Sequence, residues 1–330
     1  MGNENIYLVT GGAGFIGFYL SQSLLKKGVR VVGFDNLNVY YDVSLKQERL
    51  SILEQYDNYT FVRGDLADKE TVFSLFEKYQ PQVVVNLGAQ AGVRYSIENP
   101  DAYMQSNIMG FYHILEGCRN YPVEHLIYAS SSSVYGGNEK VPFSPEDQVD
   151  HPVSLYAATK KSNELLAYSY SKLYNIPATG LRFFTVYGPL GRPDMAYFKF
   201  AKKIMEGDPI QVYNYGDLSR DFTYIDDIVE GIERVIDKAP DPDGAGVRYK
   251  IYNIGNHNPE KLMDFIGLLE KYLGREAKKE FLPMQAGDVY QTYADMSGME
   301  KDFGFLPSTS LEEGLKRFAE WFLDYYGYKD

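Results

Sequence analysis

Cysteine is nearly absent from this sequence, which has one, Cys118, among 330 residues. A single cysteine cannot close a disulfide within the chain, and no pair of cysteines offers the spacing of a metal site. Disulfide-stabilised scaffolds and cysteine-bound zinc sites are therefore excluded. We expect a protein of a reducing compartment, the cytoplasm, and we expect no metal ion in its site.

Long apolar runs and an excess of basic residues are missing as well. No stretch approaches the roughly 20 apolar residues that span a bilayer, and residues 1–5 lack the charged start and apolar run of a signal peptide. The chain carries 33 Lys and Arg against 45 Asp and Glu, and its net charge of −12 opposes attraction to phosphate backbones and anionic lipids. We therefore expect neither nucleic acid nor a membrane as a partner.

Short β-prone runs alternate with segments of helical periodicity through the first half of the chain. Residues 6–9 precede a helix near 14–27, a second strand follows at 29–34, and the pattern continues to 178–184. The apolar run at 83–87 does not alternate, which suits a strand that is covered on both faces. This rhythm predicts an α/β fold of the Rossmann type, with a doubly wound parallel sheet.

Beyond residue 187 the pattern loosens into shorter helices and strands. We expect residues 1–187 to bind a nucleotide cofactor and residues 188–330 to form a smaller C-terminal α/β domain for the substrate, with some segments packing back on the first domain. Ligands of open parallel sheets lie beyond the carboxyl ends of the strands. The substrate is therefore expected between the two domains.

A glycine-rich run follows the first predicted strand directly and opens the first predicted helix. Gly11, Gly14 and Gly17 have no side chains there, which lets a pyrophosphate approach the amide donors of a helix N-terminus. Their spacing is one residue longer than the common dinucleotide fingerprint and is typical of short-chain dehydrogenases. The alternative interpretation is a tight turn that binds no ligand.

Two aspartates stand where predicted strands end. Asp35 closes the second strand, where a carboxylate can accept hydrogen bonds from a ribose diol and repel a 2′-phosphate, so it predicts NAD rather than NADP. Asp65 and Leu66 follow the third strand, where they can hold the adenine edge. Both aspartates are also ordinary turn residues for a strand end.

Tyr156 and Lys160 stand four apart on a predicted helix, so their side chains share one face. A phenol with a pKa of about 10 is a poor base at neutral pH, but an adjacent ammonium favours the phenolate and lowers that pKa. Tyr and Lys also fall four apart by chance in many helices. The run from Ser130 to Ser133, at the end of the preceding predicted strand, turns the pair into a Ser–Tyr–Lys constellation for proton transfer.

Two arginines offer the local cations that an acidic protein needs in order to bind a diphosphate, and a third offers a partner for a carboxylate. Arg192 and Arg220 carry guanidinium groups, which suit phosphate oxygens. The alternative for both is a solvated surface position. Arg94 lies in a loop after the fourth predicted strand, where it either meets a substrate carboxylate or pairs with Glu98.

The whole sequence resembles the extended short-chain dehydrogenase/reductases, specifically the nucleotide-sugar epimerases. The motifs TGGAGFIG, SSVYG, YAATK, RFFTVYGP and RDFTYIDD begin at residues 10, 132, 156, 182 and 220. Three further motifs, AGVRYS at 91, GRPDMA at 191 and GDVYQTYAD at 287, are most similar to those of UDP-glucuronate 4-epimerases.

The resemblance implies an NAD-dependent isomerase that acts on a UDP-sugar. Tyr156 would be the base, Lys160 its pKa-lowering partner and nicotinamide-ribose ligand, and Ser131 the hydroxyl that bridges Tyr156 and the sugar 4-hydroxyl. The positions that it implies for contact with NAD are Gly11, Gly14, Phe15, Ile16, Asp35, Asn36, Asp65, Leu66, Leu87, Ala89, Gln90, Tyr156 and Lys160. The positions that it implies for the UDP-sugar are Thr185, Arg192, Gln211, Tyr213, Arg220 and Asp288.

The residues before Val-Tyr-Gly distinguish reactions within this family. Related 4,6-dehydratases carry an Asp-Glu pair there and UDP-xylose synthases a Glu, whereas this chain has Ser132 and Ser133 and so lacks a proton carrier for elimination. We expect oxidation at C4 to give a 4-keto sugar. Reduction of this ketone on its other face then converts UDP-glucuronate to UDP-galacturonate. The two serines with Thr185 are expected to hold the substrate carboxylate and hinder loss of CO₂, unless the serines only satisfy backbone groups at the strand end.

Two alternatives stay open. One is a 4-epimerase of a neutral UDP-hexose or a UDP-N-acetylhexosamine, and the other is a non-catalytic NAD-sensing protein that kept the fold without the chemistry. The intact Ser131, Tyr156 and Lys160 argue against the second. The resemblance also implies a homodimer through helices near 103–119 and 154–173, although the apolar faces of these helices could equally be covered within one chain.

Overall fold

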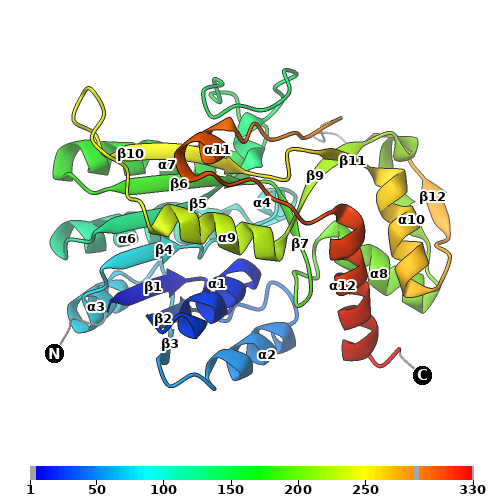
Figure 1. The fold of residues 1–330 in the computed structure, drawn as a ribbon, viewed down its shortest axis with the longest axis horizontal. Coiled ribbons are helices and arrows are strands. Elements are labelled where there is room, and N and C mark those ends of the chain that lie inside the picture. The colour runs from blue at the N-terminus through cyan, green and yellow to red at the C-terminus, as the bar shows by residue number, and fades with distance from the viewer. Residues whose placement is uncertain (1–4, 285–289, 329–330) are drawn as a thin grey trace.

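Residues 5–284 and 290–328 are described by a computed structural model of the chain, and its main feature is a sheet of seven strands (Figure 1). The strand order is β10-β6-β5-β4-β1-β2-β3, and every neighbouring pair is parallel. The strands are β1 (Ile6–Thr10), β2 (Arg30–Asp35), β3 (Tyr59–Arg63), β4 (Val83–Asn86), β5 (His125–Ser131), β6 (Ala178–Phe183) and β10 (Tyr249–Ile254). The order reverses on either side of β1, which confirms the predicted doubly wound Rossmann-type sheet.

Helices cover both faces of this sheet (Figure 1). On one face α1 (Phe15–Lys26) packs between α2 (Ser44–Leu53) and α9 (Ile225–Ile236). On the other face α3 (Lys69–Tyr79), α6 (Gly110–Asn120) and α7 (Leu155–Tyr174) lie side by side. Side-chain caps fix two of the helix starts, since Asp68 accepts from the first-turn amides of α3 and Ser154 from those of α7.

The helix expected near 103–119 is interrupted. The chain forms α4 (Tyr95–Glu98) and α5 (Pro100–Tyr103), then a π-helical segment η1 (Met104–Met109), and only then α6. The wider π-helical turn changes the angular spacing of side chains and is common near functional sites. In this chain it buries Asn107, of which 1% is exposed.

The second half of the chain forms a smaller unit and also returns to the first. Its helices are α8 (Ala196–Glu206), α10 (Leu262–Leu273), α11 (Ser297–Phe303) and α12 (Leu311–Tyr325). One small sheet has the order β11 (Pro259–Lys261), β9 (Ser219–Tyr224), β7 (Thr185–Tyr187), and β12 (Lys279–Phe281) pairs with β8 (Ile210–Val212). Strand β10 belongs to the large sheet, and helix α9 packs on it. The expected division of the chain into two domains at residue 187 therefore stays a prediction, with these two elements packed on the first domain.

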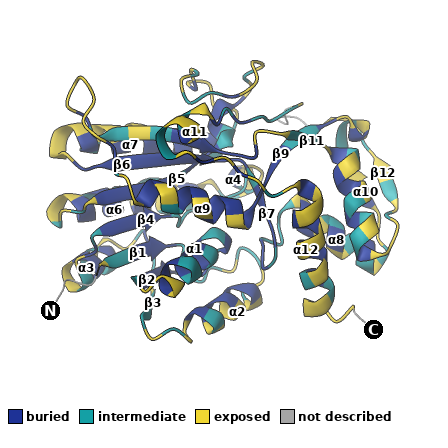
Figure 2. Cartoon of the chain, in the orientation of Figure 1, coloured by how far each residue is buried: buried dark blue, intermediate teal, exposed yellow. Residues whose placement is uncertain are grey.

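The core lies on both faces of the sheet, where the strands are buried and the helices turn exposed faces outward (Figure 2). Every residue of β4 and of β6 is buried. Burial of a valine or leucine side chain stabilises the fold by about 1.5–3 kcal/mol, so these apolar strands fix the edge of the sheet at which the site residues lie. None of the helices within residues 5–284 and 290–328 is long and apolar enough to cross a membrane.

Candidate active site

The loop between β1 and α1 is packed so closely that its glycines cannot carry side chains. Gly11 has a φ of +65°, and a Cβ there would lie 2.8 Å from the amide nitrogen of Gly88. Gly14 is the N-cap of α1 and offers no side chain to the first turn, which Phe15 and Ile16 begin. The first-turn amides are thus presented to an anion at the positive end of the helix. This cradle fits the pyrophosphate of NAD.

Asp35 closes β2 beside this loop and is buried, with 8% exposed. Its Oδ1 accepts from the amide of Leu37 at 2.8 Å, and its Oδ2 accepts from the amide of Ala13 at 3.3 Å. The Lys46 ammonium lies 3.4 Å from Oδ1. Asp35 therefore closes a strand-end turn and also reaches the glycine loop, which is where a ribose contact requires a carboxylate.

The other residues expected at the adenosine end also lie at strand ends. Asn36 donates from Nδ2 to Oδ2 of Asp65 at 2.9 Å, which joins the loops after β2 and β3. Asp65 accepts through Oδ1 from the amide of Ala67 at 2.8 Å, and Leu66 between them is buried. Asn36, Asp65 and Leu66 thus form one group.

A residue that the sequence did not single out holds the loop after β4. The Oδ1 of Asn107 accepts from the amide of Gln90 at 2.8 Å, and its Nδ2 donates at 3.0 Å both to the Gln90 carbonyl and to Oγ1 of Thr159. Asn107 thereby connects α7 with the loop that carries Leu87 and Ala89. An asparagine within an apolar helical pattern was the only signal for it, and that pattern does not reveal its partners.

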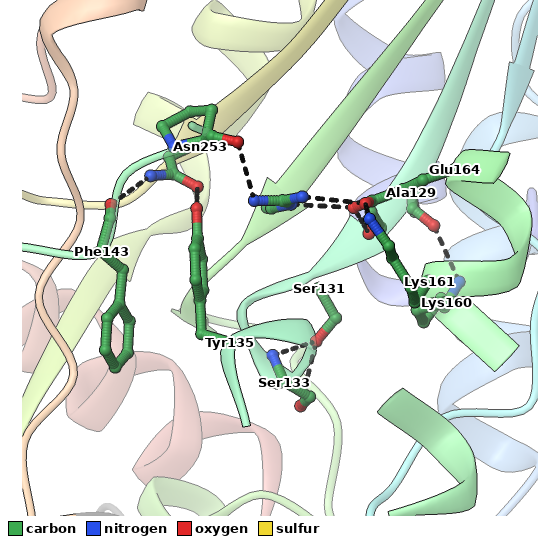
Figure 3. A network of polar contacts seen from close by, with 12 residues as sticks. Ala129, Ser131, Ser133, Tyr135, Phe143, Lys160, Lys161, Glu164 and Asn253 are labelled. Atoms are coloured by element: carbon green, nitrogen blue, oxygen red, sulfur yellow. Dashed lines mark hydrogen bonds and ion pairs between the residues drawn. The ribbon is translucent and has the colours of Figure 1, made fainter. Parts of the chain in front are cut away.

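Ser131, Tyr156 and Lys160 gather where β5 ends and α7 begins. Ser131 is the last residue of β5, Tyr156 is the second residue of α7, and Lys160 lies one turn further along and is buried. The Lys160 ammonium donates to the carbonyl of Ala129 at 2.8 Å (Figure 3). The ring of Tyr103 meets the Tyr156 ring edge to face, with 6.1 Å between centroids.

The surroundings of the Tyr156 phenol act on its pKa in opposite directions. Burial raises this pKa above its ordinary value, while the Ser131 side chain and the positive charge of Arg192 lower it. Burial also lowers the pKa of Lys160 to about 8. The structure therefore does not show the expected lowering of the phenol pKa by Lys160, whose hydrogen bond goes to Ala129; Arg192 provides the cationic effect.

Glu164, one turn beyond Lys160 on α7, belongs to a buried ion pair (Figure 3). Arg182 donates from Nε and Nη2 to the two oxygens of Glu164, both at 2.8 Å, and Ser130 donates to Oε1 of the same carboxylate at 2.7 Å. The guanidinium also lies over the Tyr135 ring, 4.9 Å from its centroid, and the Tyr135 hydroxyl donates to Oδ1 of Asn253 at 2.6 Å. Because both of its oxygens are bound, Glu164 serves structure and not proton transfer.

Ser132 and Ser133 lie in η2 (Ser132–Tyr135), a turn of 3₁₀-helix at the end of β5, and both are partly exposed. The Ser131 hydroxyl accepts from the Ser133 amide at 3.2 Å and donates to the Ser133 hydroxyl at 3.2 Å. The backbone group at the strand end is therefore satisfied by Ser131, not by the two serines after it. Thr185, the first residue of β7, is partly exposed as well.

Arg192 is neither a solvated surface residue nor a lone cation. It donates from Nε to Oδ1 of Asp194 at 3.0 Å and from Nη2 to Oδ2 at 2.6 Å, and 24% of its side chain is exposed. Asp194 also accepts from the Tyr40 hydroxyl at 3.2 Å. The fork orients the guanidinium and leaves Nη1 without a hydrogen bond to any residue that the structure describes.

The remaining substrate positions fall into a separate group. The Arg94 guanidinium lies 5.7 Å from the centroid of the Tyr213 ring, and among the described residues it forms no ion pair with Glu98. The Tyr213 hydroxyl donates to Oε1 of Gln211 at 2.9 Å.

The other two predicted substrate residues are Arg220 and Asp288. Arg220 donates from Nη1 to the carbonyls of Ser219 at 3.0 Å and Tyr290 at 3.1 Å. Asp288 lies outside the described residues.

Comparison with known proteins gives one consistent family. The family described as GDP-mannose 4,6 dehydratase matches residues 8–318. Protein CapI of Staphylococcus aureus is 52% identical over 330 residues, which cover 97% of this chain and 98% of that protein. A probable UDP-glucuronate 4-epimerase of Rhizobium meliloti is 47% identical over 328 residues, which cover 96% of each chain.

A solved structure agrees with these relatives in fold and in length. The UDP-glucuronic acid 4-epimerase of Bacillus cereus, in complex with UDP-glucuronic acid and NAD, superposes with a TM-score of 0.89 at 35% identity. The match covers 97% of this chain and all of that one.

Proposed function

The chain belongs to the extended short-chain dehydrogenase/reductase family of nucleotide-sugar enzymes, and on that premise we propose that it is an NAD-dependent UDP-glucuronate 4-epimerase. The proposal rests on one observation. The site has a candidate base, but the positions that hold acid/base residues for elimination in related enzymes hold none here. Tyr156 and Ser131 lie together at the end of β5, while the two positions after Ser131 hold hydroxyls. The buried carboxylate of Glu164, on the same helix as Tyr156, accepts from Arg182 and Ser130.

The chain's own residues divide the reaction between them. Tyr156 removes the proton of the sugar 4-hydroxyl, and Ser131 bridges the phenol and that hydroxyl. NAD, when bound, supplies reversible acceptance of hydride from C4. The 4-keto sugar then turns over within the site and is reduced on its other face, which returns the proton through Tyr156 and gives UDP-galacturonate.

The substrate carboxylate needs hydrogen bonds throughout, because a 4-keto uronate is a β-keto acid that can lose CO₂. Ser132 and Ser133 follow Ser131 directly, and Thr185 follows the strand end that pairs with Ser131; all three carry partly exposed hydroxyls and would supply such donors. Arg192 and Arg220 would take the diphosphate, and Gln211 and Tyr213 the rest of the nucleotide. A carboxylate that stays hydrogen-bonded departs less readily than one in an apolar pocket.

Incubation with UDP-glucuronate and no added NAD, followed by NMR of the sugar C4 proton, tests the proposal. We expect UDP-galacturonate to appear, and we expect the Tyr156→Phe variant to lose about 100-fold or more in kcat, as for other lost general bases. Tyr168→Phe, an exposed tyrosine of the same helix, is the matched control and should keep its activity.

The other products each point to a different enzyme. Release of CO₂ with a UDP-pentose would replace the epimerase by a decarboxylase. Turnover of UDP-glucose or UDP-N-acetylglucosamine in place of the uronate would make the protein an epimerase of neutral UDP-sugars. Full activity in Tyr156→Phe would remove this site from the chemistry.

We also propose that the enzyme is a cytoplasmic homodimer. The supporting observation is a group of exposed apolar side chains on α7 and the adjoining η1. Leu165 and Leu173 of α7 are 60% and 67% exposed, and Met104 and Met109 of η1 are 45% and 40% exposed. A second copy that covers this surface would bury them.

A further inference from the structure

Residues 36–49 run from the ribose site to the middle of α2 and contact both predicted ligand sites. The side chains that make these contacts are Tyr40, Lys46 and Arg49. Lys46 is buried and holds Asp35, with 3.4 Å between Nζ and Oδ1. We call residues 36–49 the bridging segment.

Arg49 is the most unusual residue of the bridging segment, because it is fully buried and forms no ion pair with any described carboxylate. It donates from Nη1 to the carbonyl of Ala13 in the glycine loop at 3.0 Å. It also donates to the carbonyl of Leu190 from Nε at 3.0 Å and from Nη2 at 2.7 Å, and to that of Gly191 at 3.0 Å. One guanidinium therefore fastens the loop that cradles the cofactor to the loop that carries Arg192.

Burial of an unpaired cation is costly, so this arrangement needs a compensating benefit. Backbone carbonyls and the Tyr41 hydroxyl accept from Arg49 but do not neutralise its charge. That charge lies between two loops that are both expected to hold diphosphates, one of NAD and one of the UDP-sugar. A diphosphate bound at either loop would offset part of the cost of burying this charge.

Tyr40 makes a second connection to the same substrate loop. Its hydroxyl donates to Asp194 at 3.2 Å, and Asp194 holds Arg192 in a two-pronged ion pair. Tyr40 also packs on Tyr95, with 4.7 Å between ring centroids, and its hydroxyl lies 2.8 Å from the place where a Cβ of Gly92 would be. The bridging segment thus leaves β2 at the ribose site and meets the loops after β4 and β7.

We propose that the bridging segment couples the two sites, with Arg49 and Tyr40 as positioning residues, so that a UDP group on Arg192 slows the release of NAD. The inference rests on the proposed function, because it requires both ligands to occupy the sites described above. A diphosphate bound to Arg192 fixes the 190–194 loop. Arg49 passes that constraint to the glycine loop, and Tyr40 passes it to the loop after β4. To the extent that UDP raises the equilibrium affinity for NAD, linkage requires that bound NAD raises the affinity for UDP by the same factor.

The test measures the release of NAD from the saturated enzyme, with and without UDP. Alcohol dehydrogenase and ethanol convert released NAD to NADH, whose absorbance reports the rate. For the unmodified enzyme we expect UDP to slow release about tenfold, within the usual range of coupling between sites. We expect this ratio to fall to about threefold or less in Tyr40→Phe and in Arg49→Lys, since each loses contacts of about 1 kcal/mol.

Two matched controls remove the same groups elsewhere. Tyr252→Phe deletes a hydroxyl that donates to Asp302 at 2.6 Å, and Arg248→Lys changes a guanidinium that donates to the Pro240 carbonyl at 3.1 Å. Both should keep the tenfold ratio. A merely structural role of Tyr40 or Arg49 would change stability and the two release rates alike, and would leave their ratio unchanged.

Three outcomes would overturn the proposal: no effect of UDP on the unmodified enzyme, an unchanged ratio in Tyr40→Phe, or an equal loss in the controls. If Arg49→Lys does not fold, Tyr40→Phe decides alone, because it removes only a partly exposed hydroxyl. The NMR assay on the same preparations separates the two proposals. An intact ratio without turnover of UDP-glucuronate would contradict the proposed function and support the coupling.

Discussion

The reactivity of the site depends on how much phenolate Tyr156 carries, and its surroundings work against the phenolate as well as for it. Burial raises the pKa of the phenol, and only Ser131 and Arg192 oppose that effect strongly. Lys160, with its pKa lowered to about 8 by burial, gives its hydrogen bond to Ala129. Because the pKa of the phenol is raised, Tyr156 is mostly protonated at neutral pH, and its action as a base depends on the groups that lower the pKa.

Replacement of Ser131 tests this balance at the level of one hydroxyl. Ser131 lowers the pKa of Tyr156, so Ser131→Ala raises it, and less phenolate is present at any given pH. We expect the ascending limb of kcat/KM against pH to move to higher pH and kcat at neutral pH to fall about 100-fold. Initial rates from pH 6 to 10 measure both. The control is Ser169→Ala, an exposed serine of α7, and an unmoved limb would show that Ser131 does not act on the phenol.

At the scale of elements, what the sequence predicted depended on where the stabilising contacts lie along the chain. Strands β1, β2, β4, β5 and β6 are largely buried, and segments of clear helical period follow β1, β3 and β5, so local patterns were sufficient to predict these elements. The π-helical segment η1 escaped prediction because its apolar residues continue the period of α6. The place of β10 beside β6 rests on pairing between residues 71 positions apart, such as Ile254 with Phe183, which no local pattern contains.

The same limit applies to the site. Motifs predicted the glycine loop, the strand ends at Asp35 and Ser131, and the position of Tyr156 at the start of α7, because spacing along one loop or helix expresses the requirement directly. The ionic and aromatic partners were not predicted. Arg94 lies over Tyr213 and not beside Glu98, and Arg192 is paired with Asp194. Such partners depend on how separate loops meet, which composition and spacing do not encode.

Asp221 of β9 illustrates how one buried carboxylate joins elements, and it makes stability depend on pH. It accepts from the amides of Asn256 at 2.6 Å, His257 at 3.1 Å and Ala294 at 3.1 Å. Burial nevertheless raises its pKa from 3.8 to about 6. The folded state thus binds this proton more tightly than the unfolded state. The contribution is fully present below pH 4 and is lost as the pH rises through 6.

The change Asp221→Asn should remove this dependence. A shift of about two pKa units corresponds to about 3 kcal/mol, so the free energy of unfolding of the variant should gain roughly that amount on the unmodified protein between pH 4 and pH 7. Urea denaturation at four pH values in this interval measures the difference. Asp241→Asn, an exposed position, is the control. Parallel stability curves for Asp221→Asn and the unmodified protein would contradict the assignment.

At the scale of the whole molecule, the net negative charge opposes association of two copies, whereas the apolar face of α7 favours it. A net charge of −12 keeps molecules apart and repels a substrate that carries a diphosphate and a carboxylate, so binding relies on local cations such as Arg192. The exposed leucines and methionines of α7 and η1 favour association instead, since apolar side chains gain free energy when a partner covers them. Association of two copies there would place the interface on the helix that also carries Tyr156 and Lys160.

A charge on that face should therefore separate the copies. Leu165→Glu would place a carboxylate in the middle of the interface, where its desolvation without a partner costs several kcal/mol, so we expect a monomer by sedimentation equilibrium at micromolar concentration. The interface supports α7, so kcat should fall by about threefold to tenfold as the position of Tyr156 becomes less fixed. The change Leu306→Glu, at a leucine that is 37% exposed on another part of the surface, should leave the mass of the dimer unchanged. An unmodified protein that sediments as a monomer, or a Leu165→Glu variant that stays dimeric, would show that this apolar face has another purpose.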